Sequence, residues 1–213
     1  ELHFEIVKFG LLSKDAMLGN ALVDMYAKCG MLDKAHEVFD ALPIQDVVSW
    51  NALITGYAQL GKVKNVIFLC RKMIAEDRLP DLVTFTVLLT ACTHAGLIDE
   101  GELYLEAMRP VYGLIPTLEH NACLVDLFSS AGLFDKAIAV IERVPPADSL
   151  QLWLALLRAC QKCSNVELGR WAFDQAMNFD ENNCAAIVSM SNIYAAAGVE
   201  EAETFKSKSR SGK

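Results

Sequence analysis

The fold of this chain is decided by residues 47–81, which read VVSWNALITGYAQLGKVKNVIFLCRKMIAEDRLPD. One face of a first helix is marked by four apolar residues at the spacing i, i+3, i+4 and i+7, namely Trp50, Leu53, Ile54 and Tyr57. Gly61 stands where a helix end favours a left-handed residue. A second apolar helix is predicted over residues 63–75, and we expect Pro80 to stop it. The stretch is therefore a predicted helical hairpin.

The same pattern recurs on both sides of this hairpin. Cut at matching places, the chain gives a partial unit and six further units, at residues 1–15, 16–46, 47–81, 82–117, 118–149, 150–183 and 184–213. Glycine holds the fifteenth place in most units, as Gly30, Gly61, Gly96, Gly132 and Gly198, whereas Ser164 holds it in the fifth. An acidic residue that suits the start of a second helix follows three positions later, as Asp33, Asp99, Asp135, Glu167 and Glu201. This register predicts an all-α, right-handed α-solenoid, a superhelix of stacked helix-turn-helix hairpins.

Composition limits the kinds of partner. The 213 residues carry a net charge of −8, so a nucleic acid would have to be held by a local groove rather than by the overall field. The seven cysteines, among them Cys29, Cys92 and Cys123, are interpreted as reduced, mostly buried thiols of an intracellular protein. No run of residues is long and apolar enough to span a membrane.

Several segments closely resemble plant pentatricopeptide repeat (PPR) proteins of the PLS subclass, in which repeat lengths alternate. They are GNALVDMYAKCG (19–30), DVVSWNALITGYAQLGK (46–62), VTFTVLLTACTHAGLIDEG (83–101) and EHNACLVDLFSSAGLFDKA (119–137). Two later segments resemble the C-terminal E-type extension, WLALLRACQKCSNVELGRWA (153–172) and SNIYAAAG (191–198). The resemblance implies the following units: part of an L repeat (1–15), S (16–46), P (47–81), L (82–117) and S (118–149) repeats, a first extension motif (150–183), and a second extension motif with a frayed tail (184–213). It also implies that the DYW deaminase domain of some relatives lies outside this chain.

In this family, each repeat binds one base of single-stranded RNA, which is selected by the fifth and last residues of the repeat. An amide suits that role because it offers a donor and an acceptor to a Watson–Crick edge. The resemblance assigns uridine, and more weakly cytidine, to the pairs Asn20 with Asp46 and Asn51 with Asp81. Little base choice is expected from the pairs Thr86 with Thr117 and Ala122 with Ser149. The second residue of each repeat would pack on the base: Met17, Val48, Val83 and, in the fourth repeat, Glu119.

Simpler roles compete with these assignments. Asn20 and Asn51 could be helix N-cap or turn residues, and Asp46 and Asp81 could cap the following helix. Four aromatic residues are expected in the core rather than against bases: Trp50, Tyr57, Phe85 and Trp153. Two lysines beside the inter-helix turns are candidate phosphate contacts, although a solvated surface position is the alternative for both Lys28 and Lys62.

Two short patterns imitate a zinc-dependent deaminase. His3 and Glu5 have the H-x-E spacing, and Cys160 and Cys163 have the C-x-x-C spacing. Because the two halves lie in different repeats, we expect no metal site. We also find no phosphate-binding glycine loop and no nucleophile-base set, so neither a cofactor nor a catalytic site is predicted.

The resulting hypothesis is a non-catalytic RNA-binding protein, the specificity factor for organellar C-to-U RNA editing. The resemblance places it in a mitochondrion or chloroplast. A deaminase or other editing-factor protein is expected at the extension from Leu150, and homodimerisation stays open. The alternative is a scaffold for protein–protein interaction, similar to tetratricopeptide repeats.

Overall fold

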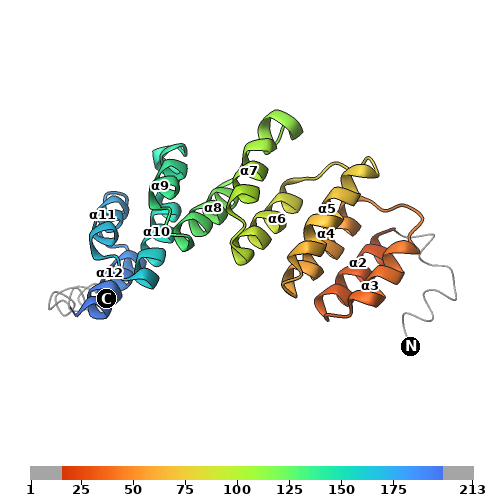
Figure 1. The fold of residues 1–213 in the computed structure, drawn as a ribbon, viewed down its shortest axis with the longest axis horizontal. Helices are drawn as coiled ribbons and strands as arrows, with labels where there is room; N and C mark the ends of the chain where they lie inside the picture. Colours follow the sequence, from red (N-terminus) through yellow and green to blue (C-terminus); the bar gives the residue numbers. More distant parts are fainter. Residues whose placement is uncertain (1–15, 199–213) are drawn as a thin grey trace. The chain divides into compact units, whose positions relative to one another are not determined.

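The computed structural model describes residues 16–198, and all regular structure in that range is helical. Figure 1 labels the α-helices in chain order: α2 (Ala16–Lys28), α3 (Leu32–Asp40), α4 (Val47–Gln59), α5 (Val63–Ala75), α6 (Leu82–Ala95), α7 (Ile98–Tyr112), α8 (Leu118–Ser130), α9 (Phe134–Glu142), α10 (Leu150–Cys163), α11 (Val166–Met177) and α12 (Cys184–Ala197). A short 3₁₀ helix, η2 (Pro146–Asp148), lies between α9 and α10. The predicted all-α class of helical hairpins is confirmed. The partial unit at 1–15 and the predicted tail lie outside the described residues.

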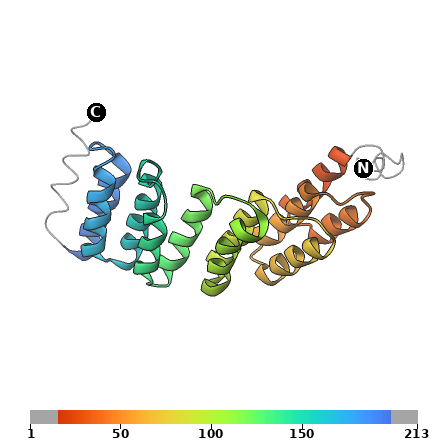
Figure 2. The ribbon, with the colours of Figure 1, turned by 90° about the horizontal axis from the view of Figure 1, so that it is seen from above.

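The chain divides into two compact units, Glu1–Ile115 and Pro116–Lys213, and the hairpins stack within each. In the first unit, α2 packs against α3 and α4, and α4 in turn packs against α5 and α6. In the second unit, α8 packs against α9 and α10, and α10 packs against α11 and α12. Figure 2 shows the successive hairpins of each unit side by side. The first helix of one hairpin therefore contacts the first helix of the next, as a solenoid requires.

The core of the first unit contains the predicted apolar face of α4. Trp50, Leu53 and Ile54 are completely buried, whereas Tyr57 is half-buried at the edge. The Trp50 ring meets the buried Phe39 ring of α3 edge-on, with 4.6 Å between ring centroids. Phe85 and Trp153 are also buried. The prediction that these aromatic side chains belong to the core is confirmed, with Tyr57 only partly enclosed.

The helix ends follow the glycine register. Backbone φ is positive at all five register glycines, namely Gly30, Gly61, Gly96, Gly132 and Gly198, and also at Ser164. The predicted acidic residues lie in the first turns of their second helices, for α3, α7, α9 and α11. The role given to Pro80 is wrong, however. Helix α5 ends at Ala75 because Asp77 adopts a left-handed φ of 57°, and Arg78 N–H donates to the Met73 carbonyl at 3.0 Å.

The surface carries more cysteine than expected. Cys70, Cys92 and Cys160 are buried and Cys123 is half-buried, but the rest are exposed: Cys29, Cys163 and Cys184. The prediction of mostly buried thiols is therefore wrong, because three of them lie near helix ends or in turns.

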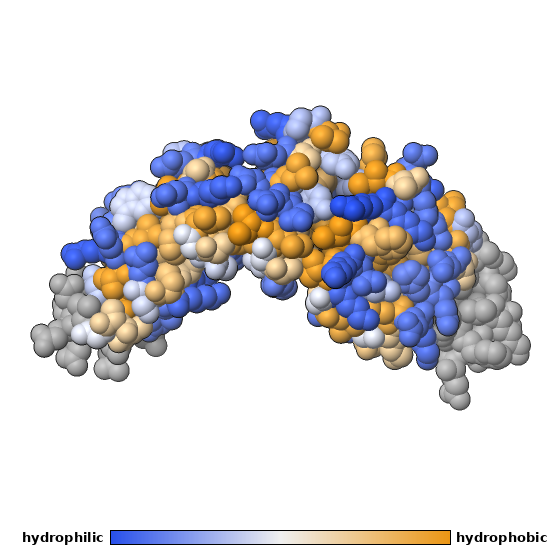
Figure 3. Space-filling model, viewed as in Figure 1, coloured by the Kyte–Doolittle hydropathy of each residue, from blue (hydrophilic) through white to orange (hydrophobic). Residues whose placement is uncertain are grey.

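Figure 3 shows that apolar residues also reach the surface in both units. Within residues 16–198, no helix combines the length and the apolar character that crossing a membrane would need.

Candidate nucleic-acid interface

Asn20 and Asp46 lie near the two ends of the repeat at 16–46 and are joined by side-chain hydrogen bonds. Asn20 is the fifth residue of α2, and Asp46 directly precedes α4. The Asn20 Nδ2 group donates to both carboxylate oxygens of Asp46, at 3.1 Å each. Asp46 also caps α4, since its carboxylate accepts from the Ser49 backbone N–H at 2.9 Å. The structure thus brings this predicted pair together, with Asp46 serving two purposes.

Asn51 and Asp81 form the corresponding pair one repeat later, in a tighter network. Asn51 Nδ2 donates to Asp81 Oδ1 at 2.9 Å. The Asn51 carbonyl oxygen accepts from the Thr84 hydroxyl at 2.6 Å. Asp81 and Thr84 also form a capping box at the start of α6, in which Thr84 N–H donates to Asp81 Oδ1 at 2.9 Å. Asn51 is only 8% exposed, but it contacts polar groups and not the hydrophobic packing.

Both amides lie inside helices, at the fifth residue of α2 and of α4. The alternative that Asn20 and Asn51 are N-cap or turn residues is therefore wrong. The alternative that Asp46 and Asp81 cap the following helix is confirmed, and it coexists with their contacts to the two amides.

The same network keeps Asp81 ionised. Burial alone would raise the pKa of this carboxyl group, because it disfavours the charged form. Hydrogen bonds from the Thr84 backbone, the Asn51 amide and the Thr84 hydroxyl outweigh burial and hold the pKa of Asp81 below its ordinary value of 3.8. An ionised carboxylate only accepts hydrogen bonds, so the NH₂ side of the Asn51 amide must face Asp81.

Exposed apolar side chains precede the fifth position of three repeats, which is an amide in the first two and a threonine in the third. Met17 is 79% exposed, Val48 is 61% exposed and Val83 is 53% exposed. Each lies three residues before the fifth position of its repeat, a spacing that places two residues on one helix face. Exposed apolar groups beside hydrogen-bonding amides are what a flat, polar-edged base would contact.

Comparisons with known proteins identify the repeats. The PPR repeat family matches residues 45–94, and the PPR repeat matches residues 20–43 and 83–109. A pentatricopeptide repeat-containing protein of Arabidopsis thaliana is 42% identical over 192 residues, which cover 90% of this chain and 32% of that protein. The chain is a PPR protein of the plant type. A second Arabidopsis relative, named as chloroplastic, is 39% identical over 204 residues, which cover 96% of this chain and 24% of that protein.

Solved PPR structures share the fold. The crystal structure of the PPR protein PPR10 from maize aligns with a TM-score of 0.69 and 21% identity, covering 90% of this chain and 29% of that chain. PPR10 in complex with an 18-nucleotide psaJ RNA element aligns with a TM-score of 0.58 and 19% identity, and the alignment covers 93% of this chain and 28% of that chain. This PPR chain thus spans about a quarter to a third of the length of the relatives it matches.

The remaining base-selection candidates differ from the Asn–Asp pairs. The Thr86 hydroxyl donates to the backbone carbonyl of Leu82 at 3.1 Å, and the Thr117 hydroxyl lies 2.6 Å from His120 Nδ1 in the capping box of α8. Ala122 is half-buried in α8. Ser149 is buried, and its hydroxyl donates to the Pro146 carbonyl at 2.9 Å. The three hydroxyl groups bond within their own turns and Ala122 has no polar side-chain atom, so base selection by these residues stays a prediction.

The two candidate phosphate contacts of this PPR chain have unequal surroundings. Lys28 Nζ lies 2.7 Å from the Asp24 carboxylate, in an exposed ion pair one helical turn away. Lys62 Nζ lies over the Tyr57 ring, 5.9 Å from its centroid. A phosphate would therefore compete with a carboxylate at Lys28 but only with an aromatic face at Lys62.

The zinc-like patterns do not form a site in the part that the structure covers. Cys160 is buried in α10, whereas Cys163 is exposed and its thiol lies 3.5 Å from the Cys160 carbonyl. Residues 16–198 contain no cluster of three or more His, Cys, Asp or Glu side chains that could hold a metal ion. His3 and Glu5 lie outside the described residues.

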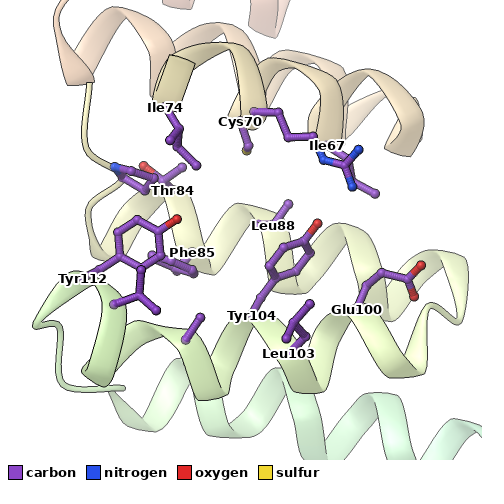
Figure 4. Close-up of a pocket in the computed structure, with 14 residues that line it drawn as sticks. Ile67, Cys70, Ile74, Thr84, Phe85, Leu88, Glu100, Leu103, Tyr104 and Tyr112 are labelled. Atoms are coloured by element: carbon purple, nitrogen blue, oxygen red, sulfur yellow. The ribbon is translucent and has the colours of Figure 1, made fainter. Parts of the chain in front are cut away.

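A separate, mainly apolar pocket lies between α5, α6 and α7. Its volume is about 360 Å³. Figure 4 shows Ile67, Cys70 and Ile74 of α5 facing Leu103 and Tyr104 of α7 across it, with Leu88 and Phe85 of α6 between the two sets. Glu100 and Arg71 supply charge at its border. Such a pocket suits an apolar side chain, not a base held by an amide.

Thr84 is the residue of the interface that sequence reasoning missed. Its spacing from Asp81 is that of a capping box, a signal that was present in the sequence. Its bond to Asn51 crosses 33 residues and had no local signal. Only the stacking of α4 on α6 brings the two side chains together.

Proposed function

We propose that this PPR chain binds single-stranded RNA by one-repeat-one-base recognition. The observation that carries the proposal is that Asn20 contacts Asp46 and Asn51 contacts Asp81, two equivalent amide–carboxylate pairs in successive stacked hairpins. Each amide keeps a donor and an acceptor for one base edge. The RNA would run 5′ to 3′ along the repeats from the N- to the C-terminus, with two adjacent pyrimidines, preferably uridines, opposite these pairs.

We also propose the cellular role. The units would be S, P, L and S repeats at residues 16–46, 47–81, 82–117 and 118–149, followed by E-type extension motifs. The protein would be a non-catalytic specificity factor that positions an organellar transcript for C-to-U editing. The deaminase would come from a partner protein, or from another part of a longer protein, and would dock near the extension from Leu150. One relative is named chloroplastic, which supports an organelle without choosing between chloroplast and mitochondrion.

The free energies of the individual contacts limit the affinity for RNA. Each base contact of this kind contributes about 1–3 kcal/mol. Two selective pairs on a chain of net charge −8 should give weak binding, which falls steeply with salt if phosphate contacts contribute to it. We therefore expect selectivity between bases, but not tight binding of the RNA.

A selection from randomised single-stranded RNA tests this proposal. We expect the enriched RNAs to share two adjacent pyrimidines, with uridine most frequent. A variant with Asn20→Ala and Asn51→Ala should lose that enrichment and keep its helical circular dichroism. Enrichment of unrelated sequences, or the same motif from the double variant, would contradict the proposal.

The apolar pocket favours one second candidate, a scaffold for a protein partner. A partner helix could insert an apolar side chain between Ile74 and Leu103, which are both exposed. Leu103→Asp would then abolish partner binding and leave RNA selection unchanged, whereas Asn51→Ala would do the opposite. The two functions are therefore separable by two single substitutions.

A further inference from the structure

The two Asn–Asp pairs are held differently. Asn51 is fixed from both sides, because Asp81 accepts from its NH₂ group at 2.9 Å and the Thr84 hydroxyl donates to its carbonyl at 2.6 Å. Asn20 is held by Asp46 through its NH₂ group, at 3.1 Å to each oxygen. Ser49, which corresponds to Thr84 in sequence position, turns its hydroxyl to the backbone carbonyl of Asp46 at 2.8 Å instead.

The proton in the short contact can be assigned. The carbonyl oxygen of Asn51 has no hydrogen, so the proton in this 2.6 Å contact must come from the threonine, whose hydroxyl lies farther, at 3.0 Å, from its other acceptor, Asp81 Oδ1. The Thr84 oxygen in turn accepts from the Asp81 N–H at 3.1 Å. Thr84 is only 1% exposed, so water does not replace these bonds easily. Rotating the amide by 180° would set its oxygen against the ionised Asp81 carboxylate, and the Thr84 hydroxyl could no longer donate to the amide.

Amide orientation matters for telling uracil from cytosine. At its Watson–Crick edge, uracil presents the N3–H donor beside the O4 acceptor. Cytosine presents the N3 acceptor beside the N4–H donor, in the same places but reversed. One N–H and one lone pair of the Asn51 amide remain for the base. A fixed amide therefore suits one of the two pyrimidines, whereas an amide that can rotate suits either.

We propose that Thr84 is a positioning residue that makes the repeat at 47–81 stricter for uridine over cytidine than the repeat at 16–46. This inference rests on the proposed one-repeat-one-base function. Thr84 acts through Asn51 and does not itself contact the base. Thr84 is the third residue of the following repeat. Base choice at one repeat therefore depends on the third residue of the next repeat.

The test uses a short RNA in which one base at a time is changed between U and C. At each of the two base positions, it measures the ratio of the affinity for U to the affinity for C. In the unsubstituted chain, the ratio opposite Asn51 should exceed that opposite Asn20 by about three- to tenfold, the effect of one hydrogen bond. Thr84→Val, which removes the hydroxyl at similar volume, should lower the ratio opposite Asn51 to the level found opposite Asn20. Thr84→Ser should retain it.

Ser49→Ala is the matched control, because its hydroxyl bonds the backbone and not Asn20. It should leave both ratios unchanged. Both RNAs are titrated against one protein preparation, so a loss of folded protein lowers both affinities alike and leaves the ratio intact. An unchanged ratio opposite Asn51 in Thr84→Val, or an equal fall at both positions, would overturn the inference. If the unsubstituted chain shows no base preference at either position, the proposed function itself fails, and the inference fails with it.

Discussion

Gly56 of α4 lies directly against Ala27 of α2, so closely that a Cβ atom at Gly56 would be 2.5 Å from the Ala27 Cβ and 3.1 Å from its Cα. The missing side chain lets the first helices of two successive hairpins approach each other. This approach sets how Asn20 and Asn51, on the same two helices, are spaced along the stack. Packing further along the same two helices thus contributes to the spacing of the two amides.

Gly56→Ala should destabilise the protein. Although alanine favours a helix by about 1 kcal/mol, the clash with a neighbouring backbone costs typically 1–3 kcal/mol, so we expect a net loss of about 1 kcal/mol. Gly169→Ala is the matched control, since its Cβ would come closest to the end of a side chain, at 2.8 Å from Ile193 Cδ1, and would make an ordinary contact with Cys160 Cβ at 3.5 Å. Urea denaturation checks both variants. Equal stability of the two would contradict the close packing of α2 and α4.

Thiol reactivity should divide the cysteines by burial. Cys29, Cys163 and Cys184 are exposed and should react with a maleimide in the native protein. Cys70 and Cys160 should react only after unfolding, because burial, with a smaller effect of a neighbouring cysteine, raises the pKa of each to about 12. Mass spectrometry of labelled peptides gives the order in which the cysteines react. Early labelling of Cys70 would mean that α5 does not pack as described.

Asp81 should stabilise the fold in a way that depends on pH. Its pKa in the folded state is lowered, so its stabilising effect is fully present above the ordinary value of 3.8 and is lost as the pH falls through the lower folded value. Asp81→Asn keeps a good N-cap residue but removes the charge. The difference in melting temperature between the two proteins should be constant from pH 7 to about pH 5 and shrink below about pH 4. A difference that grows on acidification would contradict the hydrogen-bonded carboxylate.

The two lysines should contribute unequally to RNA binding. Each phosphate contact adds about 0.7 to the slope of log affinity against log salt for a single strand. Lys62→Ala should reduce the slope by about that amount if it binds a phosphate, and Lys28→Ala should reduce it less because Asp24 competes. Titrations at several salt concentrations measure both slopes. A larger effect at Lys28 would reverse the assignment.

How far the sequence predicts the structure depends on the range of the interaction. The face of Trp50, Leu53 and Ile54 and the left-handed Gly61 follow local spacing, and the structure confirms them. Pro80 was expected to end α5, but the left-handed Asp77 ends it. The sequence did not mark this aspartate, among others, for a left-handed conformation.

Contacts between repeats were harder to predict. The Asn51–Asp81 pair could be named by family resemblance, but the bond from Thr84 to Asn51 and the approach of Gly56 to Ala27 depend on how one hairpin lies on the next. The sequence contains no periodicity that reports those distances. For the same reason, the exposed Cys163 and Cys184 were not distinguished from the buried Cys160.

The most direct test of the central claim, that one amide–carboxylate pair selects one base, is to change Asn51 alone. Asn51→Thr, with Asp81 kept, shortens the side chain and leaves a hydroxyl that can donate to the O6 or the N7 acceptor of guanine. Binding is measured with four RNAs that differ only at the base opposite this repeat. We predict that the preferred base changes from U toward G at that position and nowhere else; an unchanged order of the four affinities would contradict the account.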